Sequence, residues 1–299
     1  MTHKKSIYPL IISLVFCIAA TATATAVAPG QAEAVTAYAN ENTDDTTGLG
    51  KGSAMQPNVA ETSPGAAAAY MIAGEPEKAL PILEAVVASQ DMSEASPTYG
   101  QFQWYGGAEQ AYSFDATLYV LPVVAWLLEE HPQDLAEIKN PLTESLSAGL
   151  QAVEAETIEP RSETYYLLQA ACLASSGRAL GRPETAAAAT DRVQRWLEMV
   201  TRTGFPAGHS QTFDALRLAC LNWVWWGAGE SAAVDAAIQI ASADIAGRIW
   251  TPGPMLAGAA WRAYPGDYLT GGGVSTYVLP MFGEGNYENA EPFSMFITL

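Results

Sequence analysis

The sequence has few basic residues, few histidines and few cysteines. Of its 299 residues, 14 are Lys or Arg and 32 are Asp or Glu, which gives a formal net charge of −18. We expect no nucleic-acid partner, because phosphate recognition needs a basic surface. Three histidines and three cysteines, without the spacing of metal ligands, predict no zinc site. We also expect no cofactor, since the chain lacks a phosphate-binding loop, and it has no Gly-x-Ser-x-Gly elbow of a serine hydrolase.

Long apolar runs are also scarce, and the longest lies at the N-terminus. Lys4 and Lys5 precede an apolar run over residues 8–20, and an Ala-Thr-Ala sequence ends at Ala26. This pattern is typical of a secretory signal peptide over residues 1–26. The run is shorter than the roughly 20 residues of a bilayer span, so a membrane anchor is the lesser alternative, as is lipidation at Cys17. We expect a secreted or periplasmic protein without a membrane span, whose charge becomes −20 once the two lysines are removed.

Residues 27–63 contain almost no large apolar side chain. Such a composition cannot bury enough surface to offset the entropy lost on ordering. We therefore predict a disordered linker over 27–63 and a folded domain over 64–299. Hydrophobic residues make up 49% of the chain, which is ample for the core of that domain.

An internal repeat is the most informative feature of the chain. The ten residues from Thr164 align with the ten from Thr212, 48 positions later, and both segments contain Ala-Cys-Leu. Phe-Asp-Ala occurs at 114–116 and again at 213–215. A period of this length indicates a stack of supersecondary units.

The repeat predicts four helical hairpins. Nearly all-apolar helices are expected to begin near residues 65, 113, 163 and 211, each followed by a more polar helix, over 76–89, 142–156, 184–201 and 232–248. Pro76 and Pro183 mark helix beginnings, and Gly74, Gly177 and Gly227 mark helix ends. The predicted fold class is all-α, an α/α toroid or incomplete toroid whose apolar helices form the inner ring. Oligomeric state is not predicted.

The repeat also bears on the cysteines. Cys172 and Cys220 occupy equivalent points on adjacent inner helices, whose axes should lie roughly 8 to 10 Å apart. That is beyond the roughly 7 Å over which two Cα atoms can be bridged. We predict two free, buried thiols.

The segments that lead into the inner helices are rich in aromatic, glycine and polar residues, and in a ring they would gather at one mouth. Packing of loop aromatics is one interpretation, and sugar binding is the other. The candidate substrate-binding residues are Trp104, Tyr105, Asp115, Tyr166, Asp214 and Trp261. Asp115 and Asp214 fall in the first turns of their helices, where acids also stabilise the helix dipole.

His209 is the candidate acid or base, because imidazole titrates near neutral pH. Arg262 would hold a carboxylate or hydroxyl, and Tyr264 would give or take a proton. The other histidine after the leader, His131, ends a helix and has the features of a surface cap.

The runs 100–105, 204–213 and 256–264 resemble those of a family of extracellular α/α-toroid proteins that are similar to polysaccharide lyases and glycoside hydrolases. The resemblance implies an α/α toroid that acts on polysaccharide. Two positions depart from the family pattern, with Ala260 in place of His and Ala207 in place of Glu. We therefore expect a lyase-like or hydrolase-like protein, or alternatively an inactive scaffold that binds glycan or protein.

The last thirty residues, 270–299, leave the helical repeat. Three successive glycines and a β-branched run predict an irregular segment with a short strand. This tail would either fold back over the ring, with Phe293, Met295 and Phe296 against apolar surface, or take the place of a missing hairpin.

Overall fold

The structure is a computed structural model. It describes residues 39–40, 43, 49–51, 57–60, 62–106, 111–206, 211–250 and 255–256. The predicted signal peptide and the tail over 270–299 lie outside the described residues. Among the residues that are described, no helix combines the length and the apolarity needed to cross a membrane.

The described residues are mostly helical, as the all-α prediction requires. They form four consecutive helical hairpins, and the last predicted helix has exactly the observed bounds. The helices are α3 (Thr62–Ala73), α4 (Pro76–Ala88), α5 (Phe114–Glu130), α6 (Lys139–Ala155), α7 (Glu163–Ala179), α8 (Pro183–Thr203), α9 (Gln211–Ala228) and α10 (Ala232–Arg248).

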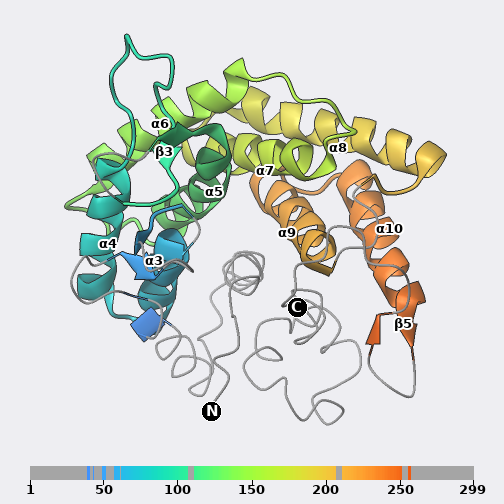
Figure 1. The fold of residues 1–299 in the computed structure, drawn as a ribbon, viewed down its shortest axis with the longest axis horizontal. Coiled ribbons are helices and arrows are strands. Elements are labelled where there is room, and N and C mark those ends of the chain that lie inside the picture. The colour runs from blue at the N-terminus through green and yellow to red at the C-terminus, as the bar shows by residue number, and fades with distance from the viewer. Residues whose placement is uncertain are drawn as a thin grey trace.

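The hairpins follow one another along an arc (Figure 1). Helix α7 packs between α5 and α9, and also contacts α6 and α8. It is buried without interruption from Tyr166 to Gly177, whereas α8 buries one stripe that includes Val193 and Trp196. The apolar helices α3, α5, α7 and α9 are therefore the central row, and the more polar helices cover it.

Proline and glycine set the helix ends, partly in the predicted way. Pro76 and Pro183 are the first residues of α4 and α8, and Gly74 follows α3 with a positive φ of 76°. Gly177 and Gly227, predicted to mark helix ends, lie in the last turns of α7 and α9, two residues before Ala179 and one residue before Ala228. Their role is close packing: a Cβ on Gly227 would stand 2.4 Å from the carbonyl carbon of Ala174.

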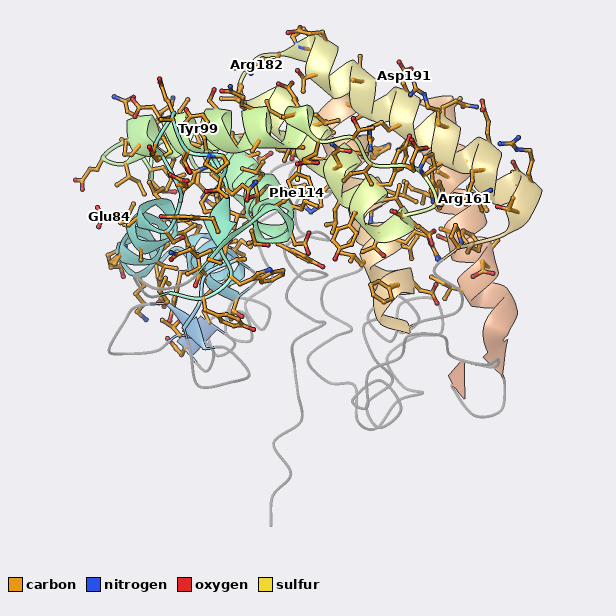
Figure 2. The ribbon with its side chains drawn as sticks, turned by 45° about the horizontal axis from the view of Figure 1, so that its top comes forward. Glu84, Tyr99, Phe114, Arg161, Arg182 and Asp191 are labelled. Atoms are coloured by element: carbon orange, nitrogen blue, oxygen red, sulfur yellow. The ribbon has the colours of Figure 1, made fainter. Side chains whose placement is uncertain are left out.

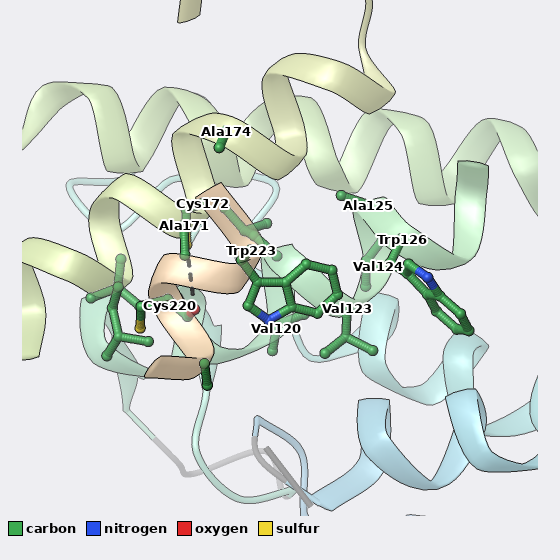
Figure 3. Packing of buried hydrophobic residues seen from close by; sticks show 14 of the residues in the cluster. Val120, Val123, Val124, Ala125, Trp126, Ala171, Cys172, Ala174, Cys220 and Trp223 are labelled. Atoms are coloured by element: carbon green, nitrogen blue, oxygen red, sulfur yellow. Dashed lines mark hydrogen bonds between the residues drawn. The ribbon is translucent and has the colours of Figure 1, made fainter. Parts of the chain in front are cut away.

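The core contains large aromatic side chains and both described thiols. Trp126, Trp196 and Trp223 are almost fully buried, and Figure 3 shows Trp126 and Trp223 among small residues of the central helices. Cys172 and Cys220 are free and buried, which confirms the prediction. The Cys172 thiol donates to the carbonyl of Leu118 over 3.3 Å. Burial raises the pKa of both thiols, so they remain protonated.

The described strands are short and pair as three antiparallel two-stranded sheets. They are β1 (Gly50–Lys51) with β2 (Pro57–Asn58), β3 (Phe102–Gln103) with β4 (Tyr112–Ser113), and β5 (Ile249–Trp250) with β6 (Met255–Leu256).

The end of the predicted linker differs from the prediction. Val59 and Ala60 are fully buried, and α3 begins at Thr62, before the expected domain boundary. Both residues belong to the hydrophobic core, and the Val59 N–H donates to the Trp104 carbonyl, so small apolar residues extend the folded domain into the predicted linker.

Candidate functional site

The predicted site residues divide into two groups. The proposed catalytic residues His209, Arg262 and Tyr264, together with Trp261, lie outside the described residues. The structure describes Trp104, Tyr105, Asp115, Tyr166 and Asp214, which lie in or just before the central helices α5, α7 and α9.

Trp104 is held at the start of α5 by a two-stranded turn. Phe102 of β3 pairs with Ser113 of β4, and the Phe102 N–H donates to the Thr117 hydroxyl over 3.1 Å. The Trp104 carbonyl accepts a hydrogen bond from the Val59 N–H. The half-buried Trp104 ring lies 5.3 Å from the ring of Tyr119, centroid to centroid. Trp104 is thus a fixed side chain that keeps part of its surface exposed.

Asp115 connects this aromatic pair to the next central helix. It lies in the first turn of α5, one helical turn before Tyr119 and therefore on the same face. Its Oδ2 accepts a hydrogen bond of 3.1 Å from the Tyr165 hydroxyl of α7. Tyr165 is 40% exposed, and it is one of the few exposed large apolar side chains in the described residues.

We call Trp104, Asp115, Tyr119 and Tyr165 the α5–α7 patch. Figure 2 labels Phe114 at the start of α5 and Arg161 just before α7, the two chain segments that the patch connects. Tyr105, also a predicted binding residue, is half-buried next to Trp104. Sequence reasoning missed Tyr119 and Tyr165, although spacing could have found Tyr119, which is four residues after Asp115.

A second cluster, between α7 and α9, has a different character. Arg217 donates to Glu163 over 2.8 Å and to Asp214 over 2.7 Å, and all three side chains are at most 3% exposed. Burial alone would lower the pKa of Arg217, but the two carboxylates raise it overall. We call these three residues the α7–α9 ion cluster.

Aromatic groups enclose the α7–α9 ion cluster. The Trp196 indole N–H donates to Glu163 over 3.2 Å, and the Arg217 guanidinium lies 4.1 Å from the centre of the Phe205 ring. A narrow hollow bordered by Thr164 and Phe213 adjoins the cluster, but it is too narrow for a water molecule. This interface is a packed contact between helices.

Two predicted binding residues therefore lie in the interior. Asp214 is fully buried in the ion cluster, and Tyr166 is 2% exposed, with the Arg192 guanidinium 4.0 Å from its ring centre. Their side chains leave no surface for a ligand to contact. The available signal was Arg217, since an arginine in an apolar helix needs buried partners.

The remaining titratable groups form no metal site within the described residues. His131 follows α5, and its Nδ1 lies 3.3 Å from the Asp134 carboxylate on an exposed turn, as a capping role requires. Comparison with protein-family models, with curated proteins and with solved structures finds no match.

Proposed function

We propose that this chain is an exported, carbohydrate-active protein that binds a polysaccharide at the α5–α7 patch. One observation carries the proposal. The carboxylate of Asp115 accepts a hydrogen bond from an exposed tyrosine, and it shares a helix face with Tyr119, whose ring pairs with the half-buried Trp104. A sugar offers the complementary groups, since its C–H face packs on aromatic rings and its hydroxyls donate to carboxylates.

The arrangement of the helices supports an extended ligand. The four hairpins follow one another along an arc (Figure 1), and stacked repeats commonly bind ligands along their extended surfaces. We propose that the four hairpins belong to an α/α toroid or incomplete toroid. A linear polysaccharide would then cross the first turn of α5 and the exposed Tyr165 at the start of α7.

We further propose that the protein acts on the polysaccharide as a lyase-like or hydrolase-like enzyme. His209 would serve as acid or base, Tyr264 would transfer a proton, and Arg262 would hold a carboxylate or hydroxyl. Trp261 would add a stacking surface. A non-catalytic glycan-binding scaffold is the second candidate, and the burial of Asp214 in the α7–α9 ion cluster favours it, because that cluster is structural.

Binding is tested by affinity electrophoresis of the full chain in gels that contain neutral, uronate or amino-sugar polysaccharides. We expect retardation in at least one gel, and Tyr165→Ala should abolish it. Met92→Ala is the control, because Met92 is similarly exposed, at 44%, but lies outside the patch. Migration unchanged in every gel would refute polysaccharide binding.

Catalysis is tested separately, by measuring new reducing ends and the ultraviolet absorbance of an unsaturated lyase product. We expect activity on a polysaccharide that is bound, and His209→Ala should abolish it while circular dichroism and retardation persist. Activity that survives in His209→Ala would overturn the role of that residue. Binding without any product would favour the scaffold.

A further inference from the structure

The central helices start with acids that are neutralised to different degrees. Asp115, Glu163 and Asp214 lie in the first turns of α5, α7 and α9. Glu163 and Asp214 share the Arg217 guanidinium. Asp115 contacts only the neutral hydroxyl of Tyr165 and has no cationic partner among the residues that the structure describes. Within the described part of the chain, no cation therefore balances the negative charge of the α5–α7 patch.

The negative charge of an ionised Asp115 is larger than the partial positive charge at the N-terminus of α5. A helix N-terminus is equivalent to roughly half a positive charge, while an ionised Asp115 carries one full negative charge. The net charge of the whole chain is also negative, with a formal value of −18. A ligand anion would thus meet net repulsion at the patch, and a cation would meet attraction.

The aromatic rings of the patch also favour a cation over an anion. The faces of Trp104, Tyr119 and Tyr165 are electron-rich, and a cation near such a face is stabilised, most strongly by tryptophan. Trp104 and Tyr119 lie 5.3 Å apart, and the hydroxyl of Tyr165 reaches the carboxylate one turn away from Tyr119. Aromatic surface and negative charge thus coincide at one place.

We propose that the α5–α7 patch selects polysaccharides that carry protonated amino groups. This inference rests on the proposed function and narrows it to a substrate class. The ammonium group pairs with Asp115 and lies against the aromatic faces, while the sugar ring stacks on Trp104 or Tyr165. No covalent step is involved.

An acidic polysaccharide is the competing ligand, and it would need a cation at the patch, either Arg262, which lies outside the described residues, or a described arginine. Arg217 does not serve, because it is buried between two carboxylates. Arg161 is exposed and precedes α7 by two residues. Figure 2 shows it well apart from Phe114, the neighbour of Asp115. The Arg161→Ala variant tests this alternative directly.

The experiment compares two oligosaccharides that differ in charge. A glucosamine hexasaccharide and an N-acetylglucosamine hexasaccharide are titrated into the full chain by calorimetry, at a mildly acidic pH where the free amines are protonated. We expect the charged oligomer to bind about tenfold more tightly, the effect of one cation–π and carboxylate contact. Asp115→Asn should remove this preference.

Asp134→Asn is the matched control, because any cationic oligomer is attracted to an acidic chain. Asp134 lies just beyond the C-terminal end of α5, also accepts one side-chain contact, and its substitution changes the net charge by the same amount. We expect Asp134→Asn to keep the preference. An equal loss in both variants would show non-specific attraction and overturn the proposal.

The other outcomes separate this inference from the proposed function. Equal affinity for the two oligomers would refute selection by charge and leave polysaccharide binding intact. Preferential binding of an oligogalacturonate, lost in Arg161→Ala, would assign the site to acidic sugars and refute the inference. Failure of every oligomer and every polysaccharide to bind would refute the proposed function as well.

Discussion

Asp115 and Asp214 occupy the same place in two copies of one motif, yet their surroundings are opposite. Each follows a phenylalanine in the first turn of a central helix. Asp214 is fully buried and pairs with Arg217 at 2.7 Å, whereas Asp115 is half-exposed and accepts a hydrogen bond from Tyr165. The repeat fixes where an acid lies along the helix, and other residues decide whether it becomes structural or accessible.

The deciding residue lies three positions further along each helix. That position is Arg217 in α9 and the fully buried Leu118 in α5. Residues three apart share a helix face, so Arg217 reaches Asp214, while Leu118 provides Asp115 with no charge. One substitution between repeats thus separates a structural ion cluster from a candidate binding patch.

Removing Arg217 should have the largest effect on stability. Arg217→Ala leaves Glu163 and Asp214 buried without a cation, and breaking a buried pair in this way typically costs about 3 to 5 kcal/mol. Urea unfolding of the variant gives the loss. The exposed Arg161→Ala should change the free energy of unfolding by less than about 0.5 kcal/mol. Equal effects would mean that the ion cluster does not stabilise the α7–α9 contact.

A larger side chain at the α7–α9 contact should cause the next largest loss of stability. A Cβ at Gly227 would stand 2.4 Å and 2.5 Å from the backbone carbon and oxygen of Ala174, so Gly227→Ala should cost about 1 to 3 kcal/mol through overpacking. The exposed Ala188→Ser in α8 is the comparison, and it should change the free energy of unfolding by less than about 0.5 kcal/mol. A thermal melt in which both variants lose the same stability would contradict this account.

Neutralising Glu163 should cost less than removing Arg217. Glu163→Gln keeps an oxygen for the Trp196 indole N–H and leaves Asp214 as the counter-ion of Arg217. We expect a loss of about 1 to 2 kcal/mol in urea, the value of a hydrogen bond to a charged group. The exposed Glu84→Gln is the control and should be near neutral. A loss as large as that of Arg217→Ala would show that Glu163 carries the cluster alone.

Removing the Tyr165 hydroxyl should have the smallest effect on stability. Tyr165→Phe deletes an exposed hydrogen bond to Asp115, and exposed polar contacts contribute about 0 to 1 kcal/mol. We expect a change of less than about 0.5 kcal/mol in thermal unfolding together with weaker retardation by a bound polysaccharide. A large loss of stability would place the α5–α7 patch among the structural contacts.

The sequence predicted the hairpins well because their signal is repetitive. Apolar spacing, Pro76 and Pro183 located the helices, and the bounds 232–248 were predicted exactly. Cys172 and Cys220 lie at equivalent positions of the repeat, which also predicted that both thiols are free. These features depend on position along a helix, which a single sequence records directly.

The candidate site was less predictable, because it depends on rotation about the helix axis and on neighbouring helices. Tyr166 and Tyr165 are adjacent in sequence, but the first is buried and the second is exposed. The aromatic content of this segment did not distinguish the two, and the prediction named Tyr166 instead of Tyr165. Similarly, the sequence placed Gly227 near a helix end, but it did not show that Gly227 packs against the backbone of Ala174 in the neighbouring helix.

The guanidinium of Arg217 also has a consequence for cooperativity. It connects Glu163 of one repeat to Asp214 of the next, so the hairpins α7–α8 and α9–α10 cannot separate without stranding buried charge. The polar contacts between α5 and α7 are the Tyr165–Asp115 hydrogen bond, the Cys172–Leu118 hydrogen bond and the exposed Arg178–Glu129 ion pair, and none of them strands a buried charge when the helices separate. Because a stack of repeats unfolds through its interfaces, we expect the hairpins α7–α8 and α9–α10 to unfold as one cooperative unit. The α5–α7 patch lies on the border of that unit, where a ligand that bridges Trp104 and Tyr165 would extend cooperativity toward the N-terminal hairpins.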